Sequence, residues 1–135
     1  MKPAFQLEFA DVQKIAHAAA AEAQRNGWAV SIAIVDEGGH LLHFQRLDGA
    51  AAMSSHMAPA KAHTAAVARR PSKVYEELIN GGRYSFLSAP LLEGMLEGGV
   101  PILKDGQCLG AVGVSGVKSQ EDAQIAQAGI AALGL

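Results

Sequence analysis

Apolar and polar positions change their spacing several times along this chain, and each change predicts a new element. From about Glu8 to Asn26, apolar residues recur every three to four positions, which is typical of a helix packed on one side. They are Val12, Ile15, Ala16, Ala19 and Ala23. Gly27 is a natural C-terminal stop. Over Ala29–Val35 the period becomes two with both faces apolar, so we expect this strand to be covered on both sides.

Two turn sequences predict β-hairpins. Asp36-Glu37-Gly38-Gly39 separates the first strand from a returning strand over His40–Leu47. Further along, Lys104-Asp105-Gly106 separates apolar residues 98–103 from apolar residues 107–115, and Asp-Gly between apolar runs is a strong hairpin signal. Strands that arrive as hairpins predict an antiparallel sheet.

Three further helices are expected. Ser54 or Ser55 can cap a helix that runs to about Ala68, in which Pro59 is tolerable only near the first turn. Ser72 can cap a short helix through Ile79, and residues 120–133 read as a C-terminal helix. Residues 83–97 are compatible with a short helix, a short edge strand or a loop that shapes a site.

The order of elements predicts the fold class. It runs helix, hairpin, helices, hairpin, helix, so helices can cover both faces of the sheet. We expect one α+β domain over residues 1–135, a three-layer α/β/α sandwich with an antiparallel sheet of about five strands. A chain of 135 residues is long enough to bury a core of this kind.

Composition and charge limit the classes of molecule that the protein is expected to bind. The net charge is −2 and the basic residues are scattered, which argues against nucleic acid and anionic membranes. One Trp, two Tyr and four Phe stand beside abundant Ala and Gly, so we expect a partner copy to complete the apolar surface in a homo-oligomer. The single Cys108 allows no disulfide within the chain. We find no signal peptide and no membrane-length apolar run, and expect a cytoplasmic protein.

Five histidines are the main candidates for metal or ligand binding. They are His17, His40, His43, His56 and His63. His56 and His63 share a helix face but stand roughly 10 Å apart along its axis, so they cannot bind one metal ion from the same chain. They could touch opposite ends of a wide planar ligand, line a subunit interface, or be ordinary surface residues. His17 lies on the flank of the first helix as a solvated side chain or as an axial ligand to haem iron.

Lys61 and Arg46 each allow a ligand-binding and a structural interpretation. Lys61 could pair with a ligand carboxylate such as a haem propionate; otherwise it could pair with an acidic side chain of the protein or extend its aliphatic stem over the sheet. Arg46, late in the second strand, has the same alternatives. Gly110, Gly113 and Gly116 do not form a dinucleotide-binding fingerprint, and their missing side chains favour close packing of a helix, a subunit or a flat ligand on the sheet. No nucleophile elbow, paired-cysteine motif or carboxylate dyad assigns a catalytic residue.

Four stretches together resemble the GlcG/HbpS family, which includes haem-binding proteins and the C-terminal domain of PduO-type proteins. They are Val30-Ser-Ile-Ala-Ile-Val-Asp-Glu-Gly-Gly-His-Leu, Lys61-Ala-His-Thr-Ala-Ala, Gly98-Gly-Val-Pro-Ile and Gly106-Gln-Cys-Leu-Gly-Ala-Val-Gly-Val-Ser-Gly. The resemblance, completed by Glu121-Asp122, covers nearly the whole chain. It implies a profilin-like fold, close-packed oligomers and, for some members, binding of haem or a related tetrapyrrole. It implies no settled enzymatic activity.

Three functions follow as hypotheses. The chain binds haem or a related tetrapyrrole; or it is an enzyme or accessory factor for a small metabolite of a glycolate- or diol-type pathway; or it serves oligomerisation alone. For haem, His17, His56 and His63 are the candidate iron ligands. Lys61 is the first candidate for holding a propionate, and Arg46 is the second. We expect no separate metal site.

Overall fold

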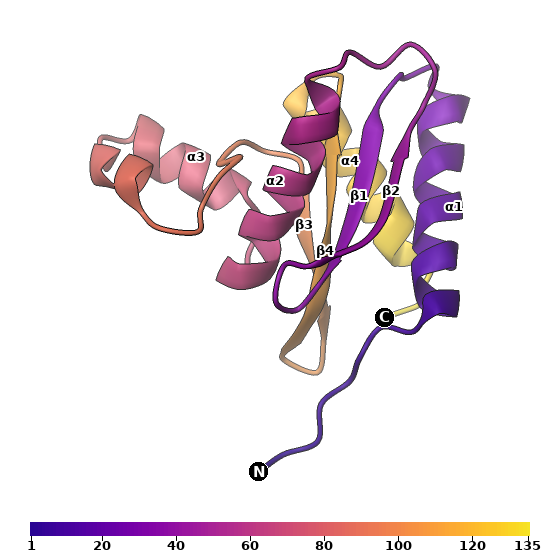
Figure 1. Ribbon diagram of the computed structural model, residues 1–135, viewed down its shortest axis with the longest axis horizontal. Helices are drawn as coiled ribbons and strands as arrows, with labels where there is room; N and C mark the ends of the chain where they lie inside the picture. The colour runs from indigo at the N-terminus through magenta and orange to yellow at the C-terminus, as the bar shows by residue number, and fades with distance from the viewer.

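The computed structural model describes residues 1–135 as four α-helices, one short 3-10 helix and four strands (Figure 1). In chain order the elements are α1 (Phe9–Arg25), β1 (Ser31–Asp36), β2 (Leu41–Arg46), α2 (Ser54–Ala68), α3 (Lys73–Asn80), η1 (Tyr84–Ser88), β3 (Gly99–Lys104), β4 (Gln107–Ser115) and α4 (Ser119–Ala131). The predicted helices and both hairpins are therefore present within a few residues of their expected bounds.

One sheet holds the four strands in the order β2-β1-β4-β3, and every neighbouring pair is antiparallel. The α+β class and the antiparallel sheet are thus confirmed. The expected number of about five strands is wrong, because residues 83–97 add no strand. Asp105 and Gly106 both have positive φ at the β3–β4 turn, as a tight two-residue hairpin loop requires.

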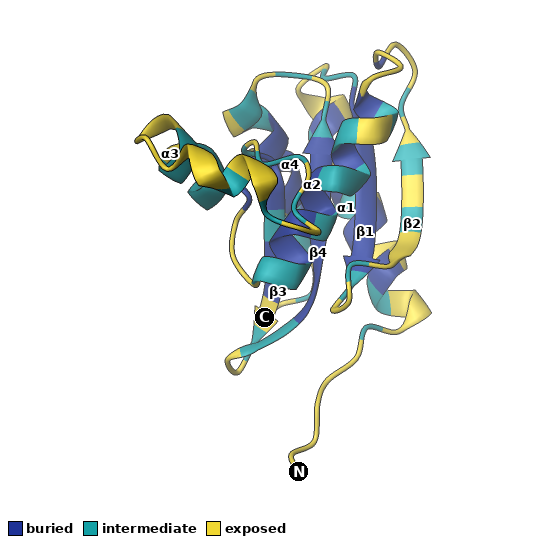
Figure 2. Ribbon diagram, turned by 60° about the vertical axis from the view of Figure 1, so that its left-hand side comes forward, coloured by how far each residue is buried: buried dark blue, intermediate teal, exposed yellow.

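Helices α1 and α4 pack against one face of the sheet, and α2 packs against the other (Figures 1 and 2). The first face is built around large aliphatic side chains, including Ile15, Ile32 and Ile125, which are fully buried. The second is thin and made almost wholly of alanine, with Ala33 and Ala111 of the sheet against the α2 alanines. The two-sided burial of β1 agrees with its unbroken apolar sequence.

Local sequence explains where α1 begins. The five residues expected on its buried face are all buried. At its start, the Asp11 carboxylate accepts a hydrogen bond from the Glu8 backbone N–H at 2.8 Å, which satisfies one of the free donors of the first turn.

Ser54 and Ser72 were expected to cap helices, but their hydroxyl groups make other hydrogen bonds. Helix α2 begins at Ser54 without a side-chain cap, and the Ser54 hydroxyl instead contacts Ser31 at 2.8 Å and donates to the Ala51 carbonyl. The Ser72 hydroxyl lies beneath the start of β3, where it donates to the Leu96 carbonyl and accepts from the Gly99 N–H. Pro59 lies inside α2 rather than in its first turn.

Helix α3 and η1 project from the body of the molecule (Figures 1 and 2). Neither element contains a fully buried residue. We call α3 and η1 the projecting arm. Of the alternatives left open for residues 83–97, the structure has a short helix, η1, and no edge strand.

Candidate functional site

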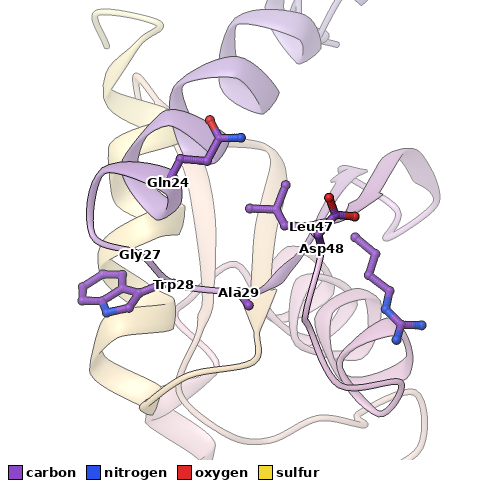
Figure 3. A pocket seen from close by; sticks show the side chains of 7 residues that line it. Gln24, Gly27, Trp28, Ala29, Leu47 and Asp48 are labelled. Carbon is purple, nitrogen blue, oxygen red and sulfur yellow. The ribbon is translucent and has the colours of Figure 1, made fainter.

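A pocket of about 400 Å³ opens where α1 ends and where β1 begins beside the end of β2 (Figure 3). Seven residues line it: Gln24, Gly27, Trp28, Ala29, Arg46, Leu47 and Asp48. Its volume lies within the range of small-molecule sites. The lining combines an indole ring, an aliphatic side chain, an amide and one charge of each sign, which suits a flat ligand with a polar end.

The chain direction reverses at Gly27, which makes this pocket. Gly27 has φ of +70°, and the Trp28 N–H closes the helix end by donating to the Ala23 carbonyl at 2.8 Å. On the opposite wall, the Leu47 N–H donates to the Val30 carbonyl and extends the β1–β2 ladder past Arg46. Both walls are therefore fixed by backbone hydrogen bonds.

Arg46 supplies the positive charge of the pocket. Its Nε and Nη2 donate to the Ala50 carbonyl at 3.1 and 2.8 Å, which fixes the plane of the guanidinium. A guanidinium has five N–H donors, so the others remain for a ligand carboxylate or for Asp48. Arg46 is exposed, so such a ligand can reach it.

His17 lies exposed on α1, seven residues before the pocket residue Gln24. Seven helical residues correspond to about 10 Å along the axis, and the two positions lie on nearly the same side of the helix. We call the pocket at the end of α1 the Arg46 pocket. Of the three candidate iron ligands, only His17 lies on a helix that lines it.

His56 and His63 lie on α2, over the other face of the sheet. His56 is exposed in the first turn. His63 is half-buried, and its Nδ1 lies 3.2 Å from the carbonyl oxygen of Gly39 at the β1–β2 turn. Because a carbonyl oxygen only accepts, His63 donates from Nδ1 and leaves Nε2 as its free nitrogen. That turn is at the opposite end of β2 from Arg46, so the structure does not gather all the candidate residues at one point.

Lys61 is buried, with its side chain 4% exposed, inside the contact between α2 and the sheet. Its ammonium donates to the Asp122 carboxylate and to the Val114 carbonyl, both at 3.0 Å. The other Asp122 oxygen accepts from the Val117 N–H at 3.2 Å. Burial raises the pKa of Asp122 above its ordinary value, and the Lys61 ammonium and the Val117 N–H partly offset this. This geometry supports the interpretation that Lys61 pairs with an acidic side chain of the protein.

Gly98, just before β3, and Gly99, the first residue of β3, leave the room that Lys61 needs. A Cβ at Gly98 would lie 2.8 Å from the Lys61 ammonium, and a Cβ at Gly99 would collide with the Lys61 carbonyl. Three stretches that looked separate in sequence, around Lys61, Gly98-Gly99 and Asp122, therefore meet at one buried ion pair. They explain how α2, the sheet and α4 are joined, and Asp122 was missing from the sequence-based candidates.

A second pair missed from sequence lies at the β1–β2 turn. His40 Nδ1 is 3.1 Å from Asp36 Oδ1, which also accepts from the Gly38 and His40 backbone N–H groups at 2.9 Å. Slight burial raises the pKa of Asp36, but these backbone donors and His40 outweigh it and hold the pKa below its ordinary value. An aspartate two residues before a glycine at a turn was the available signal.

Comparison with known proteins decides the family. A sequence model of the family described as "Haem degrading protein HbpS-like" matches residues 7–131. The chain belongs to the HbpS-like family. The GlcG/HbpS resemblance of the four sequence stretches is thereby confirmed.

Individual HbpS-like relatives agree in sequence and in fold. Protein GlcG of Escherichia coli strain K12 is 55% identical over 94 residues, which are 70% of this chain and 69% of that protein. A crystal structure of a PduOC–haem complex is 31% identical, with a TM-score of 0.84 and 95% of each chain covered. A crystal structure of HbpS is 32% identical, with a TM-score of 0.89, and covers 100% of this chain and 95% of that one.

None of the helices of this HbpS-like chain combines the length and the apolar character needed to span a membrane.

Proposed function

We propose that this protein binds haem or a related tetrapyrrole on the α1–β2 side of the sheet. The observation that supports this most directly is the haem complex of PduOC, whose fold and length match this chain at 31% identity. HbpS, a second solved relative, belongs to the family described as haem-degrading.

The residues on the α1–β2 side of the sheet fit a haem group. An exposed imidazole on a helix is a suitable axial ligand to haem iron, which favours His17. The free N–H groups of Arg46 suit a propionate, and the pocket beside it offers Trp28 as an apolar, planar contact. Lys61 is the weaker propionate partner, because its ammonium already contacts Asp122 and Val114 in the interior. When bound, haem iron would supply the redox or oxygen chemistry, and the protein would orient it.

Haemin titration of single variants tests this assignment. The wild-type protein should give a sharp Soret band with at most one haem per chain. The His17→Ala variant should lose the six-coordinate spectrum, while His56→Ala and His63→Ala serve as matched controls on α2. Arg46→Gln should weaken haemin binding several-fold without changing the iron ligand. If all three histidine variants and the triple variant bind as the wild type does, the histidine assignment is wrong.

The alternative is a small-metabolite site in the same pocket, for an enzyme or accessory factor. It is favoured by the volume of about 400 Å³ and by the opposed charges of Arg46 and Asp48. This alternative predicts no sharp Soret band. It predicts instead a metabolite that raises the melting temperature of the wild type and not of Arg46→Gln.

We further propose that the protein is a homo-oligomer. Three large apolar side chains of the edge strand β2 are exposed to solvent: Leu41, Leu42 and Phe44, at 55%, 45% and 37%. An uncovered apolar edge strand is costly for a monomer, because its free backbone groups and side chains invite a neighbour.

A further inference from the structure

A second hollow lies in the projecting arm, between α2, α3, η1 and the segment that leads into β3. Its volume is about 330 Å³, and it shares no lining residue with the pocket at the end of α1. Five apolar side chains face it: Met57, Ile79, Leu87, Met95 and Leu96. A concave, mainly apolar site of this size is typical of a small-ligand site.

The arm exposes its apolar side to this hollow instead of packing it into the core. Helix α3 has an amphipathic sequence, yet none of its residues is fully buried, and Ile79 remains only half-buried. On the opposite rim, Leu87 is 66% exposed. A ligand in the hollow would cover both side chains and remove their apolar surface from water.

The wall formed by residues 93–97 is fixed at three places. The Thr64 hydroxyl donates to the Glu93 carbonyl, the Ser72 hydroxyl donates to the Leu96 carbonyl, and the Glu97 N–H donates to Glu76 Oε1 at 2.8 Å. Between them, Gly94 lies so close to α2 that an added Cβ would come within 2.8 Å of Ala60. The hollow is therefore pre-formed, which lowers the cost of binding.

Glu76 is the one charged residue that lines the hollow, and it has no basic partner. The nearby Lys73 pairs instead with Glu77 and Glu97, at 3.7 and 3.9 Å. One Glu76 oxygen accepts from the Glu97 N–H, which leaves the second oxygen free. Asn80 follows one helical turn later and also faces the hollow, so a carboxylate and an amide stand together at the edge of an apolar surface.

We propose that this hollow binds a small amphiphilic amine. The ammonium group contacts the free Glu76 oxygen and the Asn80 side chain, and the apolar body packs on Met57, Ile79 and Met95. The unpaired carboxylate selects a cation over an anion of the same shape, because placing an anion there would oppose like charges. The site is independent of haem binding.

Phenethylamine and phenylacetate form a matched pair of probes, since they share an aromatic body and differ in charge. Titrated into the haem-free full chain and followed by NMR chemical shifts, phenethylamine should saturate at the arm and bind at least about tenfold more tightly than phenylacetate. Ile79→Trp should fill the hollow and abolish binding. Glu77→Gln, an exposed change on the same helix, should leave binding unchanged. Glu76→Gln keeps an acceptor for the Glu97 N–H and should remove the preference for the amine.

Several results would overturn the proposal. They are failure of phenethylamine to saturate, equal binding by wild type and Ile79→Trp, or an amine preference that survives in Glu76→Gln. If Ile79→Trp changes the oligomeric state while the wild type binds neither probe, the hollow is a contact between copies and the proposal is wrong. Should Ile79→Trp unfold the chain, Met57→Trp fills the hollow from the α2 side and gives the same test.

Discussion

At the scale of single residues, the buried pair of Lys61 and Asp122 is the most consequential contact. Both side chains are almost fully buried, at 4% and 2% exposure, and each also has a backbone partner. A pair of this kind adds little compared with apolar residues, yet removal of one partner leaves an uncompensated buried charge. Its strongest energetic effect is therefore seen when it is broken.

Lys61→Met should lower the free energy of unfolding by about 3–5 kcal/mol, because Asp122 is then buried without its ammonium partner. Lys73→Met is the matched control on an exposed pair and should cost about 0–1 kcal/mol. The double variant Lys61→Met/Asp122→Leu should recover much of the loss. Urea unfolding measures all three variants, and a cost of under about 1 kcal/mol for Lys61→Met would contradict this account.

Asp36 makes stability depend on pH in a predictable direction. Its pKa is lower in the folded protein than in the unfolded chain, where it is about 3.9. The folded state therefore binds this proton less readily, and the stabilisation is present above pH 4 and is lost as the pH falls through the folded pKa.

Asp36→Asn should lower the melting temperature at pH 7, and the difference from wild type should shrink below pH 4. A difference that grows in acid would refute the assignment. Comparing the two proteins cancels the contribution of Asp122.

At the scale of elements, the alanine-rich contact of α2 with β4 depends on a glycine. A Cβ at Gly113 would collide with the Ala58 carbonyl and would lie 2.5 Å from the Ala62 nitrogen. This close approach confirms the steric reading of Gly113 within the run of three glycines. Helix backbone lies directly on strand backbone here, so no flexible side chain can move aside.

Gly113→Ala should destabilise the protein by about 3 kcal/mol or more, because α2 must move away from the sheet. Gly27→Ala is the control: it has open space around it and a φ of +70°, so it should cost only about 1–2 kcal/mol of backbone strain. Thermal unfolding ranks the two variants. The packing argument is wrong if Gly113→Ala is the milder change.

How far sequence predicts these elements depends on where their contacts lie. The hairpins and the main helices could be predicted, since a turn pair such as Asp105-Gly106 or a periodic apolar face is a local feature. The conformation of residues 83–97 could not be predicted, because residues 93–97 are held by Thr64, Ser72 and Glu76, and each of these lies more than twenty positions from its partner. The Arg46 pocket was equally hidden, as its walls meet only when α1 packs beside β2.

At the scale of the whole molecule, the unpaired apolar edge at β2 predicts association. Light scattering at micromolar concentration should give at least twice the 14.0 kDa of one chain. Phe44→Lys places a charge on the edge and should shift the protein towards the monomer without unfolding it, because Phe44 is already 37% exposed. A wild-type protein that stays monomeric would contradict the homo-oligomer proposal.

The ion pair that links α2 to α4 also has a consequence during synthesis. Sixty-one positions separate Lys61 from Asp122, and the carboxylate belongs to α4, which leaves the ribosome after α2 and all four strands. Until that helix emerges, the lysine has no counter-charge, so burying it beneath the sheet is unfavourable. We therefore expect the nascent chain to close its alanine layer only after α4 has emerged.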